Sequence, residues 1–460
     1  MDATTTKEKM REAQDLSFHQ SKHVAAVAVL STILTHKPFH PRANYLLSVC
    51  QMHLSTPNPT APLSKALVHY PNKPFLHYGL ALIHSQSNNN KEVEQWLPAA
   101  QQAAVLSIAA TNSPTLSAIA TLYRTHKLYS QAISLYLQVI EWDNTNLKAH
   151  KNLATCYRRT GHLKQAQQHY AIVLQALTES TMTAGALNNW AKSQITVELI
   201  THWFVACGGC IAGGSSTSSV APASFVRGLY DGYADRFDDH LIKKLHYQTP
   251  TLLTNALLHA VGKATPKLGA DHLPSSKVVM PFSKVCDLGC GTGLMISFMS
   301  DAGVVSPPNG IVGIDLSGAM VEKARSKNLY ETLHVGDMDT VLQPGSNYTL
   351  VCCCDVYPYV GDLNEPFRRV RQSMVGSGQG YFVFSTEEWR VEEVDGVKEV
   401  GSTKEHGYKL NTTGRFVHSF EYVERMAVVN SFQVLHLESI VLRMNGGQPV
   451  HGLIGVVRTV

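Results

Sequence analysis

The sequence has no long apolar run and no concentrated block of positive charge. No stretch of about 18 apolar residues occurs, and the N-terminal MDATTTKEKMREAQDL is polar, without the hydrophobic region of a signal peptide. The 460 residues carry a formal net charge of only +4, with Lys and Arg scattered along the chain. A dedicated nucleic-acid binder would show a basic patch. We therefore expect a cytoplasmic protein without membrane or nucleic-acid partners.

Cysteine is present, but not in the arrangement of a disulfide framework or a zinc site. The chain has nine cysteines, three of them consecutive at 352–354, which suits a reducing compartment. Cys207 and Cys210 form a CxxC. A zinc site needs a second pair of ligands at similar spacing, and a redox CxxC opens a helix after a strand. This pair lies instead among linker glycines, so we expect no metal.

Length and composition indicate more than one globular domain. The chain is too long for one ordinary core, and 44% hydrophobic with 16% charged residues is typical of globular proteins. Beyond Leu177, an amphipathic stretch precedes CGGCIAGGSSTSSVAPAS, which is rich in Gly and Ser. We expect a helical repeat domain over 1–178, a helix and flexible linker over 179–224 and a second domain over 225–460.

Two consecutive segments of the first half repeat each other. When the segment from Leu116 is aligned with the segment from Lys148 on their small residues, aromatic residues also match, at an offset of 34 positions. The matched pairs are Ala120 with Ala154, Tyr123 with Tyr157, Ala132 with Ala166, Tyr136 with Tyr170, and Val139 with Val173. Alanine at a helix crossing lets two backbones approach, while tyrosine fills the adjacent groove. The pattern resembles the tetratricopeptide repeat, a pair of packed antiparallel helices.

Weaker matches upstream extend the repeat. Ala26, Leu30, Ile33 and Pro38 fit the second helix of an earlier unit, and GLALIH from Gly79 fits the first helix of another. We expect about four units that form an α-solenoid. Generic helical hairpins with alanine-rich contacts are the alternative. A solenoid offers a concave surface for a protein partner or for self-association, or it only packs against the second domain and stiffens it.

The second half alternates apolar strands with helical segments. Five strands, KVCDL, IVGIDL, LHVGDM, YTLVCCCDV and GYFVFST, are separated by helical segments. Two longer strands at the C-terminus, QVLHLESIVLRM and HGLIGVVRTV, are joined by a short turn. This order predicts a Rossmann-like, doubly wound parallel sheet of seven strands that ends in an antiparallel hairpin. The expected fold class is an α-solenoid followed by an α/β domain.

The turn after the first strand, VCDLGCGTG at 285–293, indicates the cofactor by elimination. A dinucleotide fingerprint requires a small third residue so that the helix can pack on the strand, and Leu294 occupies that place. No GK[ST] follows, which excludes a P-loop. Among common users of such a turn, S-adenosylmethionine remains. Absent side chains at Gly289, Gly291 and Gly293 let the backbone approach the ligand closely.

Four strand ends in this half resemble those of class I S-adenosylmethionine-dependent methyltransferases. DLGCGTG, from Asp287, resembles their first motif. The resemblance implies these cofactor contacts: Asp315 at the ribose, with Leu316 and Met320 in the same GIDLSGAM stretch, Asp337 and Met338 at the adenine, and Asp355 beside the methyl group. A carboxylate suits a ribose because it can accept two O–H donors at once. Capping of the next helix is the alternative for the first two acids.

A closer resemblance covers nearly the whole chain. Repeats followed by SFVRGLYDGYADRFDDHLIKKLHYQTPTLL, DLSGAMVEKARSKNLYETLHVGDM and GRFVHSFEYVERMA resemble a group of predicted methyltransferases that contain tetratricopeptide repeats. The group implies this architecture but no acceptor. The insertion VVSPPNG and the longer Cys/Gly connector depart from its pattern, and both are expected in loops.

The segment YDGYADRFDDHL is one candidate for the acceptor side of the site. Tyr230, Tyr233 and Phe237 recur at a spacing that predicts one helix face. That stripe is either helix core or a lid. By analogy with class I enzymes whose N-terminal helix covers the cofactor, Tyr230 and Tyr233 would contact it through cation–π attraction to the sulfonium.

The segment HGYKLNTTGRFVHSFEYV is the other candidate. Arg415 is expected to anchor a carboxylate, and His418 is expected to act as a general base for an acceptor hydroxyl. A local hydrogen bond is the alternative for His418, because methyl transfer needs no base where alignment and desolvation suffice. No N-P-P-[YF] follows the fourth strand, which argues against methylation of nucleobase or glutamine amino groups.

The sequence therefore predicts a methyltransferase that acts on an oxygen of a small-molecule or protein-borne acceptor, with repeats that bind an unknown protein partner. Two alternatives stay open. One is a scaffold whose methyltransferase domain is inactive and only senses the cofactor. The other is a protein methyltransferase that recruits its substrate through the repeats.

Overall fold

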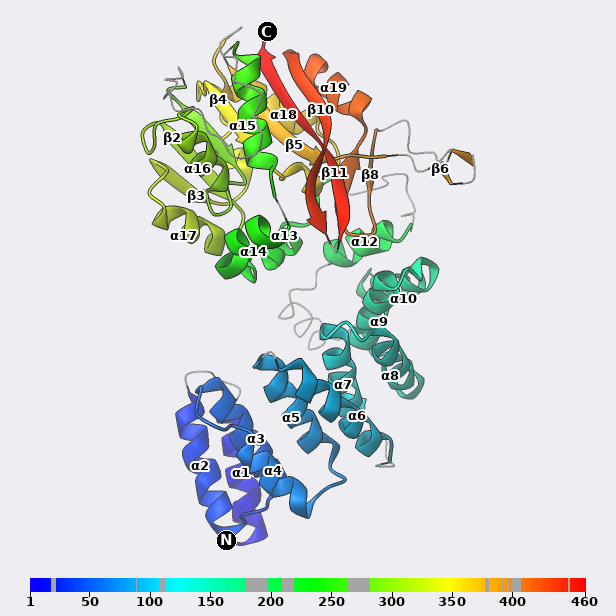
Figure 1. Cartoon of the computed structure of the whole chain (residues 1–460). Coiled ribbons are helices and arrows are strands. Elements are labelled where there is room, and N and C mark those ends of the chain that lie inside the picture. Colours follow the sequence, from blue (N-terminus) through cyan, green and yellow to red (C-terminus); the bar gives the residue numbers. More distant parts are fainter. Residues whose placement is uncertain are drawn as a thin grey trace. The chain divides into compact units, whose positions relative to one another are not determined.

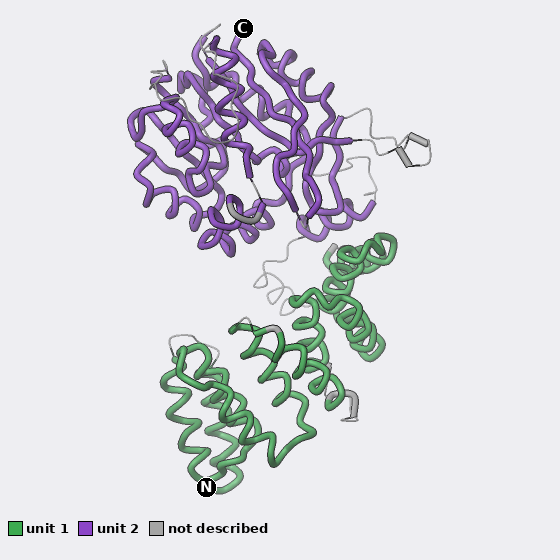
Figure 2. Tube along the Cα trace, in the orientation of Figure 1, with its two compact units in different colours: residues 1–182 green, residues 183–460 purple. Residues whose placement is uncertain are grey.

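The computed structural model describes most of the chain, as two compact units over 1–182 and 183–460 (Figure 2). The described residues are 1–17, 22–87, 89–106, 113–178, 197–208, 219–245, 247–262, 282–376, 380–390, 393–394, 397–398, 407–445 and 447–460. Each unit has its own buried clusters of apolar side chains. The expected combination of a helical repeat region with a mixed α/β domain is confirmed.

Within the described residues, the first unit consists of ten helices that pack in five successive pairs (Figure 1). They are α1 (Ala3–Ser17), α2 (His23–His36), α3 (Pro41–His53), α4 (Ala61–His69), α5 (Pro74–Gln86), α6 (Asn90–Leu106), α7 (Ser113–Thr125), α8 (Tyr129–Trp142), α9 (Leu147–Arg159) and α10 (Leu163–Thr178). The sequence predicts about four pairs. The additional pair is α3–α4, whose spacing is altered by the loop STPNPTAP.

The same side-chain contact recurs in the two clearest repeats. Thr121 Oγ1 lies 2.9 Å from the hydroxyl of Tyr136, and Thr155 Oγ1 lies 3.2 Å from that of Tyr170. Both tyrosines are fully buried, as are the alanines at the matched helix crossings. The 34-residue period therefore reflects one packing unit used twice, in which small residues admit the ring and a threonine satisfies its hydroxyl.

The second unit is built on a seven-stranded sheet with the order β10-β11-β5-β4-β1-β2-β3 (Figure 1). The strands are β1 (Val285–Leu288), β2 (Ile311–Asp315), β3 (Thr332–Val335), β4 (Leu350–Cys353), β5 (Tyr381–Glu387), β10 (Phe432–Asn445) and β11 (Gln448–Thr459). The first five run parallel, and β11 inserts antiparallel between β5 and β10. This is the predicted doubly wound sheet with a C-terminal hairpin.

Helices cover both faces of the sheet. On one face, α15 (Thr249–Ala260) and α16 (Leu294–Asp301) pack on apolar residues of the central strands. On the other, α18 (Asn364–Ser373) and α19 (Phe420–Val429) do so. Strands β1 and β4 are buried along their whole length, which agrees with their continuous apolar sequence. α17 (Gly318–Ser326), between β2 and β3, begins at Ser317, whose side chain accepts from the N–H of Met320.

Three short segments lie before the sheet, and they differ from the single helix face that the sequence predicts. α13 (Ala223–Asp231) ends before Gly232, a 3-10 turn covers Ala234–Arg236, and α14 (Phe237–Lys244) follows. Tyr230 and Phe237 therefore belong to different helices, and Tyr233 lies in the turn between them. The break at Gly232 interrupts the helix, but the rings of Tyr230 and Phe237 still meet edge to face with centroids 6.0 Å apart.

α12 (Val197–Ala206) lies in the amphipathic stretch where the sequence predicts a helix, and it belongs to the second unit. The ring of His202 bonds to the carbonyl of Gly414 at 3.0 Å, and Trp203 packs edge-on against Phe225. A side chain at Gly414 would collide with the Trp203 ring. Cys207 is buried, and Cys210 lies outside the described residues.

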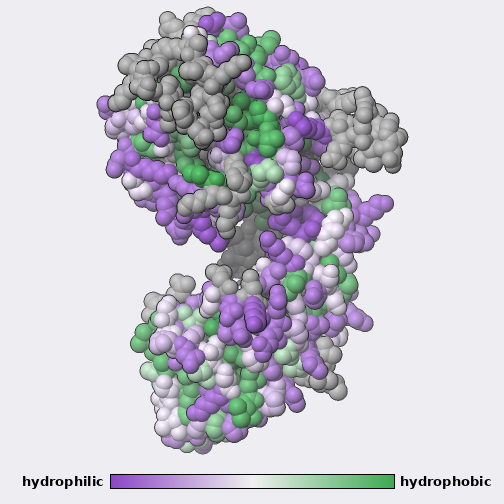
Figure 3. Space-filling view, viewed as in Figure 1, coloured by the Kyte–Doolittle hydropathy of each residue, from purple (hydrophilic) through white to green (hydrophobic). Residues whose placement is uncertain are grey.

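No helix of the described segments combines the length and the apolar character needed to cross a membrane. On the face shown in Figure 3, hydrophilic residues surround small hydrophobic patches on both units.

Candidate active site

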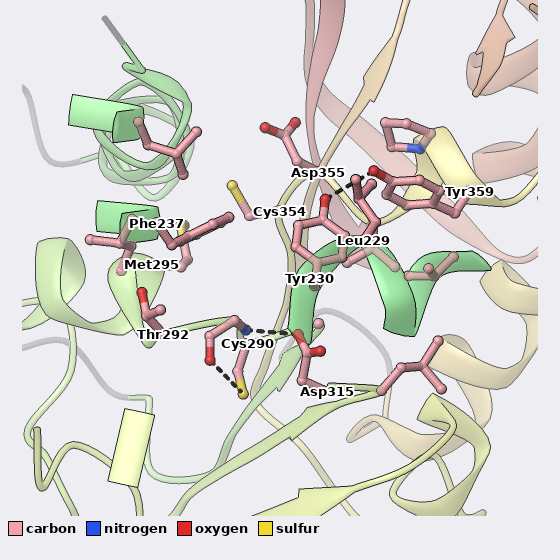
Figure 4. Close-up of a pocket in the computed structure, with 18 of the residues that line it drawn as sticks. Leu229, Tyr230, Phe237, Cys290, Thr292, Met295, Asp315, Cys354, Asp355 and Tyr359 are labelled. Atoms are coloured by element: carbon pink, nitrogen blue, oxygen red, sulfur yellow. Dashed lines mark hydrogen bonds between the residues drawn. The ribbon is translucent and has the colours of Figure 1, made fainter. Parts of the chain in front are cut away.

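A pocket opens at the carboxyl ends of β1, β2 and β4 and is covered by α13 and α14. Asp315 lies at one end of it and Asp355 at the other, with Cys354, Tyr230 and Phe237 between them (Figure 4). Ligands bind at this edge of doubly wound sheets because the loops that follow parallel strands meet there. The predicted strand-end residues are thus brought together by the topology.

The glycine turn approaches the pocket through its backbone. Gly289 and Gly291 line it, with φ of 64° and 53°, a region that disfavours residues with a Cβ. A Cβ at Gly289 would collide with Cγ2 of Val356. Gly293 caps α16 and does not line the pocket.

Asp315 is held by two backbone groups. Its Oδ2 accepts from the N–H of Gly291 at 2.9 Å, and its Oδ1 accepts from the N–H of Ser317 at 2.8 Å. Burial raises the pKa of Asp315, while these two hydrogen bonds act to lower it. Each carboxylate oxygen keeps a further lone pair, so the group can still accept from a diol. Leu316 lines the pocket beside it, whereas Met320 is fully buried in α17 and does not.

Asp337 and Met338 line the pocket after β3. The Oδ1 of Asp337 accepts from the N–H of Asp339 at 3.1 Å, so the capping role that the sequence left open is present. This contact uses only one of its oxygens, which leaves the other for a ligand.

Asp287 is buried under the glycine turn and also lines the pocket. Burial raises its pKa to about 7, although the hydroxyl of Tyr330 donates to its Oδ2 at 2.7 Å. The group therefore changes charge near neutral pH, which is unusual for a carboxyl.

Asp355 is fixed in an uncommon backbone conformation at the end of β4. Its φ is 57°, which is rare for a residue other than glycine. Its N–H donates to Ser385 Oγ at 2.8 Å, and that hydroxyl donates to Oδ1 of Asp355 at 2.7 Å. Strain of this kind persists where the surroundings over-determine it, and it clusters at functional sites.

The cover of the pocket is tied to the cofactor loops. The Oδ1 of Asp231 accepts from Ser317 Oγ at 2.5 Å, and Asp238 accepts from Thr292 Oγ1 and pairs with Lys327 at 2.7 Å. Motif reasoning missed these acids, although both lie in the YDGYADRFDDHL segment. They connect α13 and α14 to the turns after β1 and β2.

The predicted aromatic residues do reach the pocket. Tyr230, Tyr233 and Phe237 all line it, although they come from α13, the turn after it and α14. The hydroxyl of Tyr230 lies 3.0 Å from that of Tyr359, and the Tyr233 hydroxyl is hydrogen-bonded to His240. The rings of Tyr233 and Phe237 meet edge to face with centroids 5.3 Å apart. They form an aromatic wall rather than the interior of one helix.

His418 does not reach the pocket, so we do not retain it as a general base. It is fully buried, its Nδ1 lies 2.6 Å from Thr386 Oγ1, and its Nε2 lies 2.9 Å from the carbonyl of Gly361. Both ring nitrogens are thus engaged inside the protein. Burial lowers its pKa to about 4. The alternative of a local hydrogen-bonding role describes this geometry.

Arg415 does line the pocket, and it is joined there by residues that motif reasoning missed. Its Nη1 donates to Glu387 Oε1 at 3.1 Å, an oxygen that also accepts from Arg443. Arg443 and Tyr247 line the pocket as well and carry no motif.

Cys354 and Tyr359 also line the pocket. Both lie within four residues of Asp355 in the sequence, so this closeness could have indicated them as site residues.

Family models match both units of the chain. Residues 285–393 match a model described as a methyltransferase domain, and residues 135–168 match a model described as a tetratricopeptide repeat. No curated protein matches the chain significantly.

Several solved structures resemble the second unit. A S-adenosylmethionine-dependent methyltransferase from Mesorhizobium loti is 20% identical, with 39% of this chain and 92% of that chain covered and a TM-score of 0.31. A putative one from Listeria monocytogenes is 18% identical, with 45% and 99% covered and a TM-score of 0.31.

The pocket fits S-adenosylmethionine. A Cβ added at Gly291 would meet no atom closer than Cε1 of Phe237 at 3.9 Å, so the turn leaves room beside its backbone, and the carboxylates of Asp315 and Asp337 have free acceptor capacity at the strand ends where a nucleoside binds. The second unit is thus a class I S-adenosylmethionine-dependent methyltransferase domain. The protein is a methyltransferase that carries an N-terminal unit of tetratricopeptide-like helix pairs.

Proposed function

We propose that this methyltransferase acts on an oxygen of its acceptor and that Asp355 receives the proton. The observation that carries the proposal is the fixed carboxylate of Asp355 in the pocket, held by Ser385 in a strained backbone conformation. Bound S-adenosylmethionine would supply an electrophilic methyl group. The residues of this chain orient the acceptor and remove its proton.

The two carboxylate oxygens of Asp355 have different contacts and therefore different roles. Oδ1 accepts from Ser385 Oγ, while Oδ2 lies 3.8 Å from Arg443 Nη1, beyond hydrogen-bond distance. Oδ2 is therefore the atom that can accept the proton of an acceptor hydroxyl. We assign Gly289, Gly291, Asp315, Leu316, Asp337 and Met338 to the cofactor, because all of them line the pocket at the strand ends.

The aromatic wall of Tyr230, Tyr233 and Phe237 lines the pocket on the side of α13 and α14, and the carboxylate of Asp355 in the same pocket is 18% exposed. Alignment and desolvation supply much of the rate of methyl transfer, so a closed apolar cover is suited to this chemistry. Tyr230 and Tyr233 also offer ring faces to a positive charge.

We further propose that the repeat unit binds a protein partner. A hollow in this unit is lined by Gln14, His23, Arg42 and His53, among others. His23 is only 4% exposed, and neither of its ring nitrogens has a partner in the described residues. The ring stacks on that of His53 with centroids 4.8 Å apart, but among the residues that the structure describes its nitrogens are left without hydrogen bonds, which is costly, and an incoming peptide group would satisfy them.

The proposal is tested with the full-length protein, S-adenosylmethionine labelled in its methyl group, and a cell extract. The labelled methyl group is measured separately in the small-molecule and the protein fractions. This distinguishes a small-molecule acceptor from a protein-borne one. Asp355→Asn is expected to bind S-adenosylhomocysteine normally and to transfer no label, whereas the exposed control Asp301→Asn transfers normally. A product methylated on nitrogen, sulfur or carbon would contradict the oxygen proposal.

A further inference from the structure

One wall of the pocket carries two arginines that the reaction so far does not use. Arg415 precedes β9 (Phe416–His418), and Arg443 belongs to β10. Both line the pocket, and their side chains are 28% and 8% exposed. A buried arginine almost always has an ion-pair partner. The partners of Arg415 and Arg443 therefore decide what the two guanidinium groups can bind.

The two guanidinium groups share one carboxylate oxygen. Glu387 Oε1 accepts from Nη1 of Arg415 and from Nη2 of Arg443. The next acid, Asp355, is an ion-pair neighbour of Arg443 at 3.8 Å and makes no hydrogen bond to it. Each guanidinium has five N–H donors, so a single shared oxygen uses only a small part of this capacity.

The neighbouring phenols add donors to the same wall. Tyr230 and Tyr359 lie hydroxyl to hydroxyl at 3.0 Å, and the guanidinium of Arg415 lies 5.7 Å from the centre of the Tyr359 ring. Burial raises the pKa of Tyr230 well above its usual value, so this hydroxyl stays protonated. The arginines and phenols therefore give this wall many N–H and O–H donors, beside the carboxylates of Glu387 and Asp355.

We propose that the methyl acceptor carries a carboxylate, which Arg415 and Arg443 hold against this wall. The inference rests on the proposed methyl transfer at this site and specifies its substrate class. A planar carboxylate matches the fork of a guanidinium, which can donate two parallel hydrogen bonds to it. The aromatic and aliphatic side chains of α13 and α14 face the remaining body of the acceptor, which is accordingly apolar.

The charges on the wall favour a monoanion over a phosphate. Glu387 and Asp355 already bring two negative charges to the two arginines. A doubly charged phosphate would meet stronger repulsion from the two acids than a carboxylate, which adds only one charge.

The test measures binding to the full-length protein saturated with S-adenosylhomocysteine. Three carboxylates are compared by calorimetry with their neutral amides: acetate with acetamide, benzoate with benzamide, and 3-phenylpropionate with its amide. We expect at least one carboxylate to bind roughly tenfold or more tightly than its amide, because charge-assisted hydrogen bonds are the stronger kind. Arg415→Gln is expected to abolish this preference.

A second variant separates a binding role from a structural one. Glu387→Gln removes the charge that holds both guanidinium groups, so carboxylate affinity is expected to rise severalfold. A cluster that serves only the fold would give no such rise. Arg368→Gln is the matched control, because Arg368 is half exposed and pairs with Glu365 on α18, and it should leave all six affinities unchanged.

The proposal is overturned if no carboxylate binds better than its amide while S-adenosylhomocysteine binds normally. Failure of S-adenosylhomocysteine to bind the folded protein would instead contradict the methyltransferase site itself. A preference that survives in Arg415→Gln, or that does not change in Glu387→Gln, would also count against the arginine pair.

Discussion

The hydroxyl of Ser385 both accepts from the backbone N–H of Asp355 and donates to its carboxylate, at 2.8 and 2.7 Å. One buried side chain on β5 thus fixes the backbone and the side chain of Asp355, two residues after the end of β4. The link joins neighbouring parallel strands at the edge where the pocket opens.

Ser385→Ala should therefore destabilise the second unit. It removes the fully buried hydroxyl of Ser385 and leaves the N–H of Asp355 without its acceptor, which costs about 2 kcal/mol of unfolding free energy. Urea denaturation measures this. The control is Ser326→Ala, whose exposed hydroxyl bonds only to Lys323 within α17 and whose loss should cost less than about 0.5 kcal/mol. Equal losses in the two variants would refute the special role of Ser385.

Asp315→Asn should weaken the binding of S-adenosylhomocysteine. The amide has the shape of the carboxylate but can accept through only one atom, so one accepted hydrogen bond to a charged group is lost, worth roughly tenfold to a hundredfold in affinity. Calorimetry measures the change, and Asp301→Asn, exposed at the end of α16, serves as the control. Unchanged affinity would show that Asp315 does not bind the ribose.

Gly289→Ala should destabilise more than Gly345→Ala. Both glycines have positive φ, 64° and 80°, so alanine costs about 1–2 kcal/mol at either site. Only at Gly289 does the added methyl group collide with Val356, because Gly345 has no neighbour within 4 Å. Overpacking adds about 1–3 kcal/mol. Denaturation of the two variants side by side isolates the collision, and identical losses would mean that Val356 moves aside.

Asp287 should make the protein less stable as pH rises. Its folded pKa is raised to about 7 from 3.8, so the folded state binds its proton more tightly than the unfolded chain does. The stabilisation is complete below pH 3.8 and is lost as pH rises through about 7, by up to about 4 kcal/mol. Denaturation of wild type and Asp287→Asn between these limits measures it. A pH-independent difference between the two proteins would contradict the raised pKa.

His418 should act in the opposite direction. Its folded pKa is lowered to about 4 from 6.5, so stability is complete above pH 6.5 and falls by up to about 3 kcal/mol as pH drops through about 4. His418→Gln removes this loss, although it lowers stability overall because the contacts to Thr386 and Gly361 change. If the variant shows the same acid sensitivity as wild type, another group is responsible.

Local patterns were sufficient for most of the fold. The 34-residue repeat and the alternation of strands and helices predicted the architecture. Each helix or strand buries one face, and the spacing of its apolar residues along the sequence shows which type of element it is. The pair α3–α4 was missed since its proline-containing loop shifts the spacing. The break at Gly232 was missed because the aromatic spacing alone favours one continuous helix.

The sequence by itself determined the glycine turn, the strand-end acids Asp315, Asp337 and Asp355, and hence the class of cofactor. In a parallel sheet every strand end reaches the same edge, so residues with no contact in the sequence are brought together by the topology alone. Tertiary structure decided what faces the acceptor. Glu387 lies on β5 and Arg443 on β10, across the inserted β11, while Arg415 precedes β9, whose buried His418 bridges to Glu388. Such long-range neighbours leave no local pattern, since each depends on the register of strands that are distant along the chain.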